Sequence, residues 1–209
     1  MQRGFMVLAC TLLLAAPATA QWLGMPVWNS PKGGTGIGLY ADYGSGNDDA
    51  GNATTYGLRG SAAFGNIMVT LGYSSADADL ANDNNNSFGG NVAFRLIGGS
   101  LTPVAVNIQG GAARIGEANG VAAFTRATLG GGVSASLPLP LSIEPYLSLT
   151  NRWYFLDGND ESNIGWTLGA NATFGLFGLH LAYDSESGDG LDPGVFGIGA
   201  HVSLKMPGS

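Results

Sequence analysis

The sequence has little charge, and positive charge is especially scarce. Only 11% of its 209 residues are charged, with 8 Lys and Arg against 15 Asp and Glu, which gives a formal net charge of −7. An ordinary soluble domain has about 25% charged residues. A chain this poor in cations cannot neutralise a phosphate backbone, so nucleic-acid binding is excluded. Intrinsic disorder is excluded as well, because it needs low hydrophobicity with high charge, and 45% of these residues are hydrophobic.

Cysteine is nearly absent. The single one, Cys10, lies in a stretch with Arg3 near its start, an apolar run over 5–16 and a small-x-small site over 18–20. This pattern predicts a secretory signal peptide over 1–20. A transmembrane anchor is the alternative, although it needs about 20 apolar residues. Cleavage of the signal would leave a mature chain without cysteine, which excludes a disulfide scaffold and a thiol nucleophile.

Long apolar runs are missing after the signal peptide, so a mature chain that enters a membrane must do so with strands. Apolar residues instead alternate with small or polar ones, which is the period of two of a β-strand. Leu147 and Leu149, for example, share one parity, and Ser148 and Thr150 the other. The same alternation predicts ten strands, at 35–44, 54–64, 67–74, 88–97, 104–115, 121–137, 141–155, 164–174, 177–184 and 195–205.

The connections between these segments alternate between short turns and longer polar loops. Of the 15 acidic residues, 12 fall in the five longer loops, and no basic residue does. An up-and-down meander would place all the long loops at one end of the sheet and all the short turns at the other. The loops are 45–53, 75–87, 116–120, 156–163 and 185–194, and the Gly- or Pro-containing turns are 65–66, 98–103, 138–140 and 175–176.

The two parities differ in a way that separates a membrane barrel from a soluble one. A soluble sandwich or lipocalin shows water a face rich in Lys and Glu, whereas the second parity here is mostly Gly, Ser, Thr, Ala and Asn. We therefore expect this parity to fill a narrow enclosed space and the apolar parity to face lipid. The predicted fold is all-β, a closed antiparallel up-and-down transmembrane β-barrel of ten strands over 34–205, with eight strands as the alternative. Residues 21–33 would form an N-terminal periplasmic or interfacial segment, and 206–209 a C-terminal tail.

Aromatic residues mark both ends of the predicted strands, with Leu, Val, Ile, Ala and Gly between them. Amphipathic rings prefer the headgroup level, so this arrangement predicts two girdles at the membrane interfaces. The turn-side girdle contains Phe64, Phe94, Phe174 and Phe177. The loop-side girdle, on eight of the ten strands, contains Tyr43, Tyr56, Tyr73, Phe88, Trp153, Trp166, Tyr183 and Phe196.

Together, the signal peptide, the strands of roughly 8–12 residues, the alternating turns and acidic loops, and the paired aromatic belts resemble bacterial outer-membrane β-barrel proteins. The resemblance is to the small OmpA-like and opacity-like barrels and their ten-stranded relatives. It rests on pattern and not on a subfamily motif. It implies a location in the bacterial cell outer membrane, loops on the cell exterior and turns in the periplasm. It also implies contact with outer-membrane lipid and lipopolysaccharide, and insertion by the outer-membrane assembly machinery.

Seven charged residues have the parity that faces the lumen. They would form either an ion-selective constriction or a hydrogen-bonded network that fills the interior. Eight strands leave room only for side chains and about sixteen leave a channel, so a ten-stranded lumen should be nearly filled. We therefore favour a structural network formed by Asp42, Arg59, Arg95, Arg126, Glu144, Arg152 and Asp184.

Two histidines, His180 and His201, have the same inward parity and would be diagonal neighbours on the last two strands. With Asp184 they could form an acid–base pair like that of ten-stranded omptin proteases, or a metal site. They fall toward the turn side, away from the acidic mouth, and no nearby serine completes a triad. We therefore expect neither catalysis nor a bound metal there.

The acidic loops raise the question of a bound cation. Asp77, Asp79 and the run 157–161 have an oxygen density like that of calcium sites, but they lack the 12-residue spacing with its closing Glu. We expect no cofactor, apart from loose Ca²⁺ or Mg²⁺ that would bridge these loops to anionic lipopolysaccharide.

Two residues fit the strand pattern less easily. Pro145 cannot donate to the ladder, so we expect a bulge there or a strand that starts just after it. Arg114 has lipid-facing parity near the loop-side end, where its cost falls to about 0–1 kcal/mol from about 2–4 at the midplane. The alternative is a bulge at Gly110 and Gly111 that turns Arg114 inward.

The function expected from these patterns is that of an integral outer-membrane barrel with a structural or narrow-pore role and no catalysis. A surface adhesin or ligand-binding barrel is the first alternative. A barrel enzyme, omptin-like or lipid-modifying, is the second.

Overall fold

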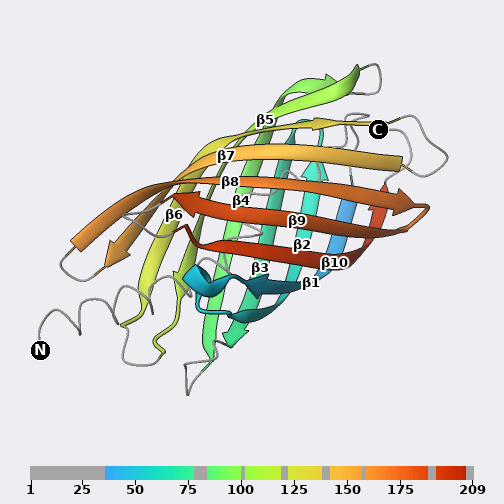
Figure 1. Ribbon diagram of the computed structural model, residues 1–209. Helices are drawn as coiled ribbons and strands as arrows, with labels where there is room; N and C mark the ends of the chain where they lie inside the picture. The colour runs from blue at the N-terminus through green and yellow to red at the C-terminus, as the bar shows by residue number, and fades with distance from the viewer. Residues whose placement is uncertain are drawn as a thin grey trace, which may run out of the picture.

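The fold is one closed sheet of ten antiparallel strands (Figure 1). The computed structural model describes residues 36–77, 84–99, 102–118, 122–137, 142–156, 159–187 and 192–205, so the segments 1–20, 21–33 and 206–209 lie outside the described residues. No helix in the described ranges is long and apolar enough to cross a membrane. The elements are β1 (Gly36–Gly46), η2 (Asp48–Ala50), β2 (Thr54–Phe64), β3 (Ile67–Asp77), β4 (Asn85–Gly99), β5 (Thr102–Ile115), β6 (Phe124–Ala135), β7 (Ser142–Leu156), β8 (Asn159–Phe174), β9 (Phe177–Ser187) and β10 (Gly194–Lys205).

Each strand pairs with its neighbours in sequence, and β1 pairs with β10 to close the barrel. The closing register runs from Gly36 opposite Lys205 to Gly46 opposite Val195. Closure gives partners to the backbone N–H and C=O groups of both edge strands, each of which would cost several kcal/mol if left unpaired in hydrocarbon. The structure confirms the closed up-and-down barrel of ten strands, and the eight-stranded alternative is wrong.

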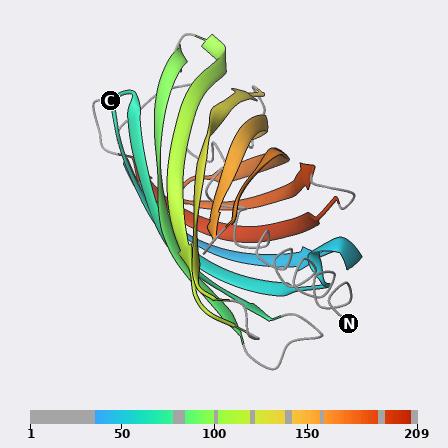
Figure 2. The ribbon, with the colours of Figure 1, turned by 90° about the vertical axis from the view of Figure 1, so that its left-hand side faces the viewer.

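The strands wind around the barrel at an angle to its axis, as Figure 2 shows. Residue pairs can be followed from strand to strand once around the barrel, starting at Lys205 on β10. The path reaches Glu186 on β9, and the Glu186 N–H donates to the carbonyl of Pro193, just before β10. One circuit therefore displaces the register by 12 residues, from 205 to 193. Strand number and this shear together set the width of a barrel. Ten strands make a lumen wider than eight do, so larger side chains are needed to close it.

Two of the turn-side connections are two-residue hairpin turns that require glycine. Gly65, between β2 and β3, has a φ of 58°, and Gly175, between β8 and β9, has a φ of 61°. Glycine adopts positive φ with little strain, and hairpin turns favour it at the first central position. No atom lies within 4 Å of the place where a Cβ would stand on either residue, so backbone conformation and not space imposes the choice.

Side chains alternate between the inside and the outside of the barrel. Leu39 and Leu58 are 71% and 64% exposed on the outside, whereas Thr70 and Ser148 are 3% and 1% exposed on the inside. Water-soluble monomers rarely expose contiguous apolar patches larger than about 300–600 Å². An apolar surface that encircles the whole barrel is the lipid-facing band of a transmembrane barrel.

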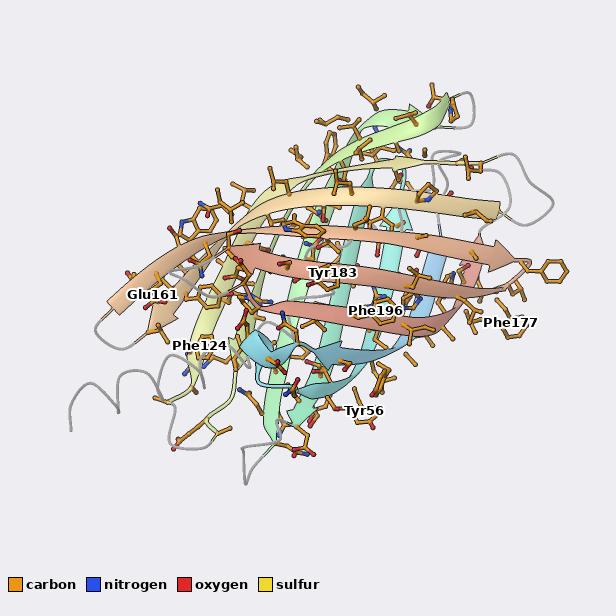
Figure 3. The ribbon with its side chains drawn as sticks, viewed as in Figure 1. Tyr56, Phe124, Glu161, Phe177, Tyr183 and Phe196 are labelled. Atoms are coloured by element: carbon orange, nitrogen blue, oxygen red, sulfur yellow. The ribbon has the colours of Figure 1, made fainter. Side chains whose placement is uncertain are left out.

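The strands extend further on the loop side than the alternation predicts. β8 begins at Asn159 and β9 ends at Ser187, so Asp160, Glu161 and Glu186 belong to strands and not to loops. Figure 3 labels Glu161 on the protruding β7–β8 hairpin. Strand residues beyond the hydrocarbon have no lipid to face, so they need not alternate apolar with polar, and the pattern gives no signal there.

The expectation for Pro145 is wrong. Pro145 lies inside β7, opposite Ala170 in an unbroken register with β8. On the other side, the continuous ladder of β6 with β7 ends at the pair of Ser134 with Tyr146. The Leu137 N–H, two residues past the end of β6, donates to the Ile143 carbonyl at 2.9 Å, and Pro145, two residues on, presents its nitrogen to the same edge. The missing N–H therefore falls just beyond the last ladder pair, and no bulge is required.

Arg114 stays on the outer face. Gly110 and Gly111 pair in regular register with both neighbouring strands, so the alternative of a bulge there is wrong. Arg114 is exposed and donates through Nη1 to Thr125 Oγ1 at 3.2 Å. The register shifts instead near the turn-side end of β4, on either side of Ile97.

Candidate functional site

Five charged side chains of the lumen, with polar and aromatic neighbours, lie in two clusters. The loop-side cluster contains Arg152, Tyr154, Asn163, Thr167, Asp184 and Glu186. The mid-barrel cluster contains Tyr40, Asp42, Arg59, His180 and His201.

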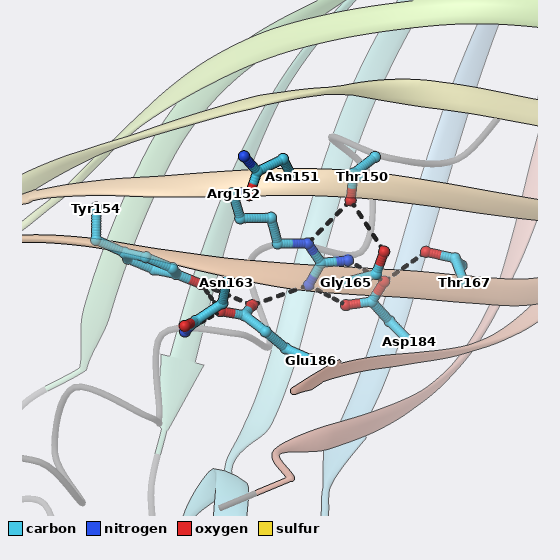
Figure 4. Close-up of polar contacts among 9 residues, drawn as sticks. All are labelled: Thr150, Asn151, Arg152, Tyr154, Asn163, Gly165, Thr167, Asp184 and Glu186. Atoms are coloured by element: carbon cyan, nitrogen blue, oxygen red, sulfur yellow. Dashed lines mark hydrogen bonds and ion pairs between the residues drawn. The ribbon is translucent and has the colours of Figure 1, made fainter. Parts of the chain in front are cut away.

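The loop-side cluster is built around Arg152 on β7 (Figure 4). The Arg152 guanidinium donates to both oxygens of Asp184 at 2.8 and 2.9 Å, and to Glu186 at 3.1 Å. Arg152 and Asp184 are each 1% exposed and Glu186 is 2% exposed. Two buried carboxylates therefore share one guanidinium, and charge-assisted hydrogen bonds of this kind are about twice as strong as neutral ones.

Other donors complete the shell of these two carboxylates. The Tyr154 hydroxyl donates to Glu186 at 2.7 and 2.8 Å, and Asn163 Nδ2 donates to it at 2.8 Å. The Thr167 hydroxyl donates to Asp184. Because the carboxylates have donors besides Arg152, the cluster is a connected network and not a single ion pair.

Glycines on the intervening strands make room for these large side chains. Arg152 on β7 reaches the acids on β9 by crossing Gly165 on β8, and a Cβ on Gly165 would overlap the guanidinium. His201 and His180 lie in the same way against Gly178 and Gly199. Arg152, His180 and His201 thus each lie over a glycine of the neighbouring strand, so glycines at these inward positions give large side chains the space to cross the lumen.

The mid-barrel cluster joins β1, β2, β9 and β10. Arg59 donates to Asp42 through Nε at 2.8 Å and through Nη2 at 2.9 Å, a bidentate pair. Its guanidinium carbon lies 4.3 Å from the centre of the Tyr40 ring, within the range of a cation–π interaction. The Arg59 side chain is fully buried, and that of Asp42 is 12% exposed.

The two histidines lie against each other, as their register predicts. Their Nδ1 atoms are 3.3 Å apart, and the Tyr40 ring centre is 5.0 Å from that of His201. Their carboxylate partner, however, is not Asp184, which is bound to Arg152. His180 Nε2 contacts Asp42, because closure of β1 on β10 brings the first strand close to the ninth.

The seven charged residues predicted to share the lumen do not form one network. Arg95 lies at the turn-side end, where Nη2 donates to the Gly65 carbonyl at 3.1 Å and to Asn66 Oδ1 at 2.8 Å. Glu144 is half-buried near the same end, on β7. Arg126 is buried on β6, and no hydrogen-bond acceptor for its guanidinium is found among the described residues.

Five cluster members escaped the sequence prediction: Glu186, Tyr154, Asn163, Thr167 and Tyr40. Each has the inward parity of a predicted site residue two positions away or on a paired strand. Glu186 continues the parity of Asp184 but was assigned to a loop. A large side chain at an inward position, two residues from an inward charge, is the signal that would have found Tyr40 and Tyr154.

The aromatic residues of the expected loop-side girdle all lie on the outer face. Tyr56 is 62% exposed, Tyr183 37% and Phe196 50% (Figure 3). Two contacts link neighbouring strands, between Tyr43 and Tyr56 and between Trp166 and Tyr183, with ring centres 5.5 and 5.6 Å apart. Tyr73, Phe88 and Trp153 are also outward. On the turn side, Phe64, Phe94, Phe174 and Phe177 are 80%, 42%, 75% and 66% exposed.

The contacts of the two histidines show which groups lie beside them. His180 contacts Asp42, Arg59 and His201, and none of these supplies a nucleophilic hydroxyl. The Thr173 hydroxyl lies 3.5 Å from His201 Nε2, which is a long contact. Within the described residues, no three His, Cys, Asp or Glu side chains are grouped to hold a metal ion. Of the acidic pair Asp77 and Asp79, only Asp77 is described.

No family model matches the chain, and no curated protein matches it. The chain is similar in structure to the N-terminal β-barrel domain of Pseudomonas aeruginosa OprF, with 12% identity and a TM-score of 0.43 over 83% of this chain and 100% of that one. It is similar to the β domain of the Bordetella autotransporter BrkA, with 14% identity and a TM-score of 0.48 over 81% of this chain and 98% of that one. Neisserial surface protein A matches with 13% identity and a TM-score of 0.35 over 80% of this chain and 96% of that one. The structures that this chain is similar to are bacterial outer-membrane β-barrels.

Proposed function

We propose that this protein is an integral outer-membrane barrel with a structural role, whose lumen is closed by its own side chains and conducts at most through a narrow path. The loops would face the cell exterior and the turns the periplasm. Its partners would be outer-membrane lipid, lipopolysaccharide and the assembly machinery. We propose no catalytic activity, because neither lumen cluster presents an activated nucleophile.

The observation that carries this proposal is the burial of three mid-barrel side chains and of Tyr146 on β7, which packs in one cluster with Tyr40. The side chains of Arg59 and His180 are 0% and 2% exposed, and Tyr40 and Tyr146 are 3% and 2% exposed. A water-filled pore would leave the side chains that line it accessible. These four residues instead come from β1, β2, β7 and β9, on different sides of the lumen, and their side chains pack together across it.

Single-channel recording in a planar bilayer tests the closed lumen. We expect the wild-type barrel to show no steady conductance like that of an open porin. The double variant Tyr40→Ala/Tyr146→Ala removes two rings from the closure and should conduct measurably. Tyr43→Ala/Tyr56→Ala is the matched control, because it removes two tyrosines from the outer face and should conduct no more than the wild type.

Two outcomes would contradict the proposal. A steady porin-like conductance of the wild type would show that the lumen is open. Equal conductance of the inward and outward tyrosine variants would show that the mid-barrel rings do not close it.

A further inference from the structure

Arg126 on β6 is a buried cation without a hydrogen-bond partner in the described part of the chain. It is 0% exposed, and Nε, Nη1 and Nη2 all lack an acceptor there. A guanidinium carries five N–H donors in a rigid fork and stays charged in proteins. Burying a charge without hydrogen bonds is strongly unfavourable, so a group that accepts from this fork would stabilise the barrel.

Hydrophobic side chains neighbour Arg126 on its own strand and on both paired strands. It lies opposite Ala113 on β5 and Tyr154 on β7. Ala113 and Tyr154 pack with Ile115 and Phe124 in one buried cluster. Neighbours of this kind offer few acceptors, and a charge among them is poorly screened.

The nearby buried acids are already occupied. Asp184 and Glu186 are bonded to Arg152, and the Tyr154 hydroxyl donates to Glu186. The loop-side cluster therefore satisfies Arg152 and leaves the fork of Arg126 without a counter-ion in hydrogen-bond contact.

A second donor without a partner among the described residues lies on the same face of β6. Thr128 is two residues along β6 and on the same inner face; it is 6% exposed, and no described residue bonds its hydroxyl. The guanidinium fork suits a planar or tetrahedral oxyanion, and a hydroxyl two residues along the same strand face can donate to the same group. We propose that Arg126 and Thr128 bind a small oxyanion, a carboxylate or a phosphate, at the loop-side end of the lumen.

Unfolding of the barrel in detergent micelles tests this site. The midpoint is measured in sodium phosphate, in sodium acetate and in sodium chloride at equal ionic strength. We expect phosphate, acetate or both to raise the midpoint of the wild type above its value in chloride. A rise in acetate alone identifies a carboxylate site, and a rise in phosphate alone a phosphate site.

Two variants separate the site from a general effect of charge. Arg126→Met should abolish the anion-dependent rise, and in chloride it should be at least as stable as the wild type because it removes the unpaired charge. Arg114→Met is the matched control, because it removes the same charge from the outer face of the adjacent strand β5. Its response to phosphate and acetate should equal that of the wild type.

Calorimetric titration with the effective anion provides a second readout. Arg126→Lys keeps the charge but lacks the fork, so we expect about tenfold weaker binding. Equal midpoints of the wild type in all three salts, with no heat of binding, would overturn the proposal. So would an unchanged response of Arg126→Met or, if that variant does not fold, unchanged affinity in both Arg126→Lys and Thr128→Val. None of these results depends on whether the lumen conducts.

Discussion

Removal of Arg152 alone should destabilise the barrel far more than removal of its whole charge cluster. Arg152→Met leaves Asp184 and Glu186, both about 99% buried, without the guanidinium that bonds three of their oxygens. Breaking a buried ion pair on one side costs about 3–5 kcal/mol, because an uncompensated charge remains. The triple variant Arg152→Met/Asp184→Asn/Glu186→Gln removes the two carboxylate charges together with the arginine. It keeps acceptors for Thr167 and Tyr154. We expect it to recover most of the lost stability.

Urea unfolding in lipid vesicles, followed by tryptophan fluorescence, measures the difference. With a slope of about 3 kcal/mol/M, a loss of about 3–5 kcal/mol lowers the midpoint by about 1–2 M. Arg114→Met removes an exposed arginine and should shift the stability by no more than about 0.5 kcal/mol. A wild-type midpoint for Arg152→Met, or a triple variant as unstable as the single one, would contradict this expectation.

The remaining predictions concern packing and the outer face. Gly165→Val places side-chain atoms where the Arg152 guanidinium lies, so we expect a loss of about 1–3 kcal/mol in the same urea experiment; an unchanged midpoint would mean that Arg152 has another route across β8. Leu58→Arg puts a charge on the lipid face near the middle of β2 and should cost about 2–4 kcal/mol in vesicles. A cost no larger than that of changing Arg114 would contradict the membrane position of β2.

The strands and their faces could be predicted because both depend on local pattern. A lipid-facing side chain must be apolar, and the next one along the strand faces the lumen, so Leu147, Ser148 and Leu149 already show which side is which. The alternation of apolar and polar residues weakens where a strand extends beyond the hydrocarbon of the membrane. Glu186 continues the inward parity of its strand, but nothing apolar alternates with it, and it therefore looked like a loop residue.

The partners inside the lumen could not be predicted in the same way. Parity places a residue inside the barrel but does not fix its height or the distant strand that faces it. Asp42 contacts His180 only because β1 pairs with β10. Asp184 is bonded to Arg152, whose side chain crosses Gly165. Such pairings depend on the shear of the whole sheet, to which every register contributes.

The pairing of β1 with β10 also constrains the order in which this protein can reach its final form. Gly36 meets Lys205, its opposite in the closing register, only after all the intervening strands exist. Pairings so distant in sequence form slowly. Until then the nascent sheet carries two open edges and an apolar face, the combination that most favours self-association. The interval between synthesis and the last strand pairing is therefore when this chain is most vulnerable, and protection in that interval matters more to its yield than the stability of the finished cylinder.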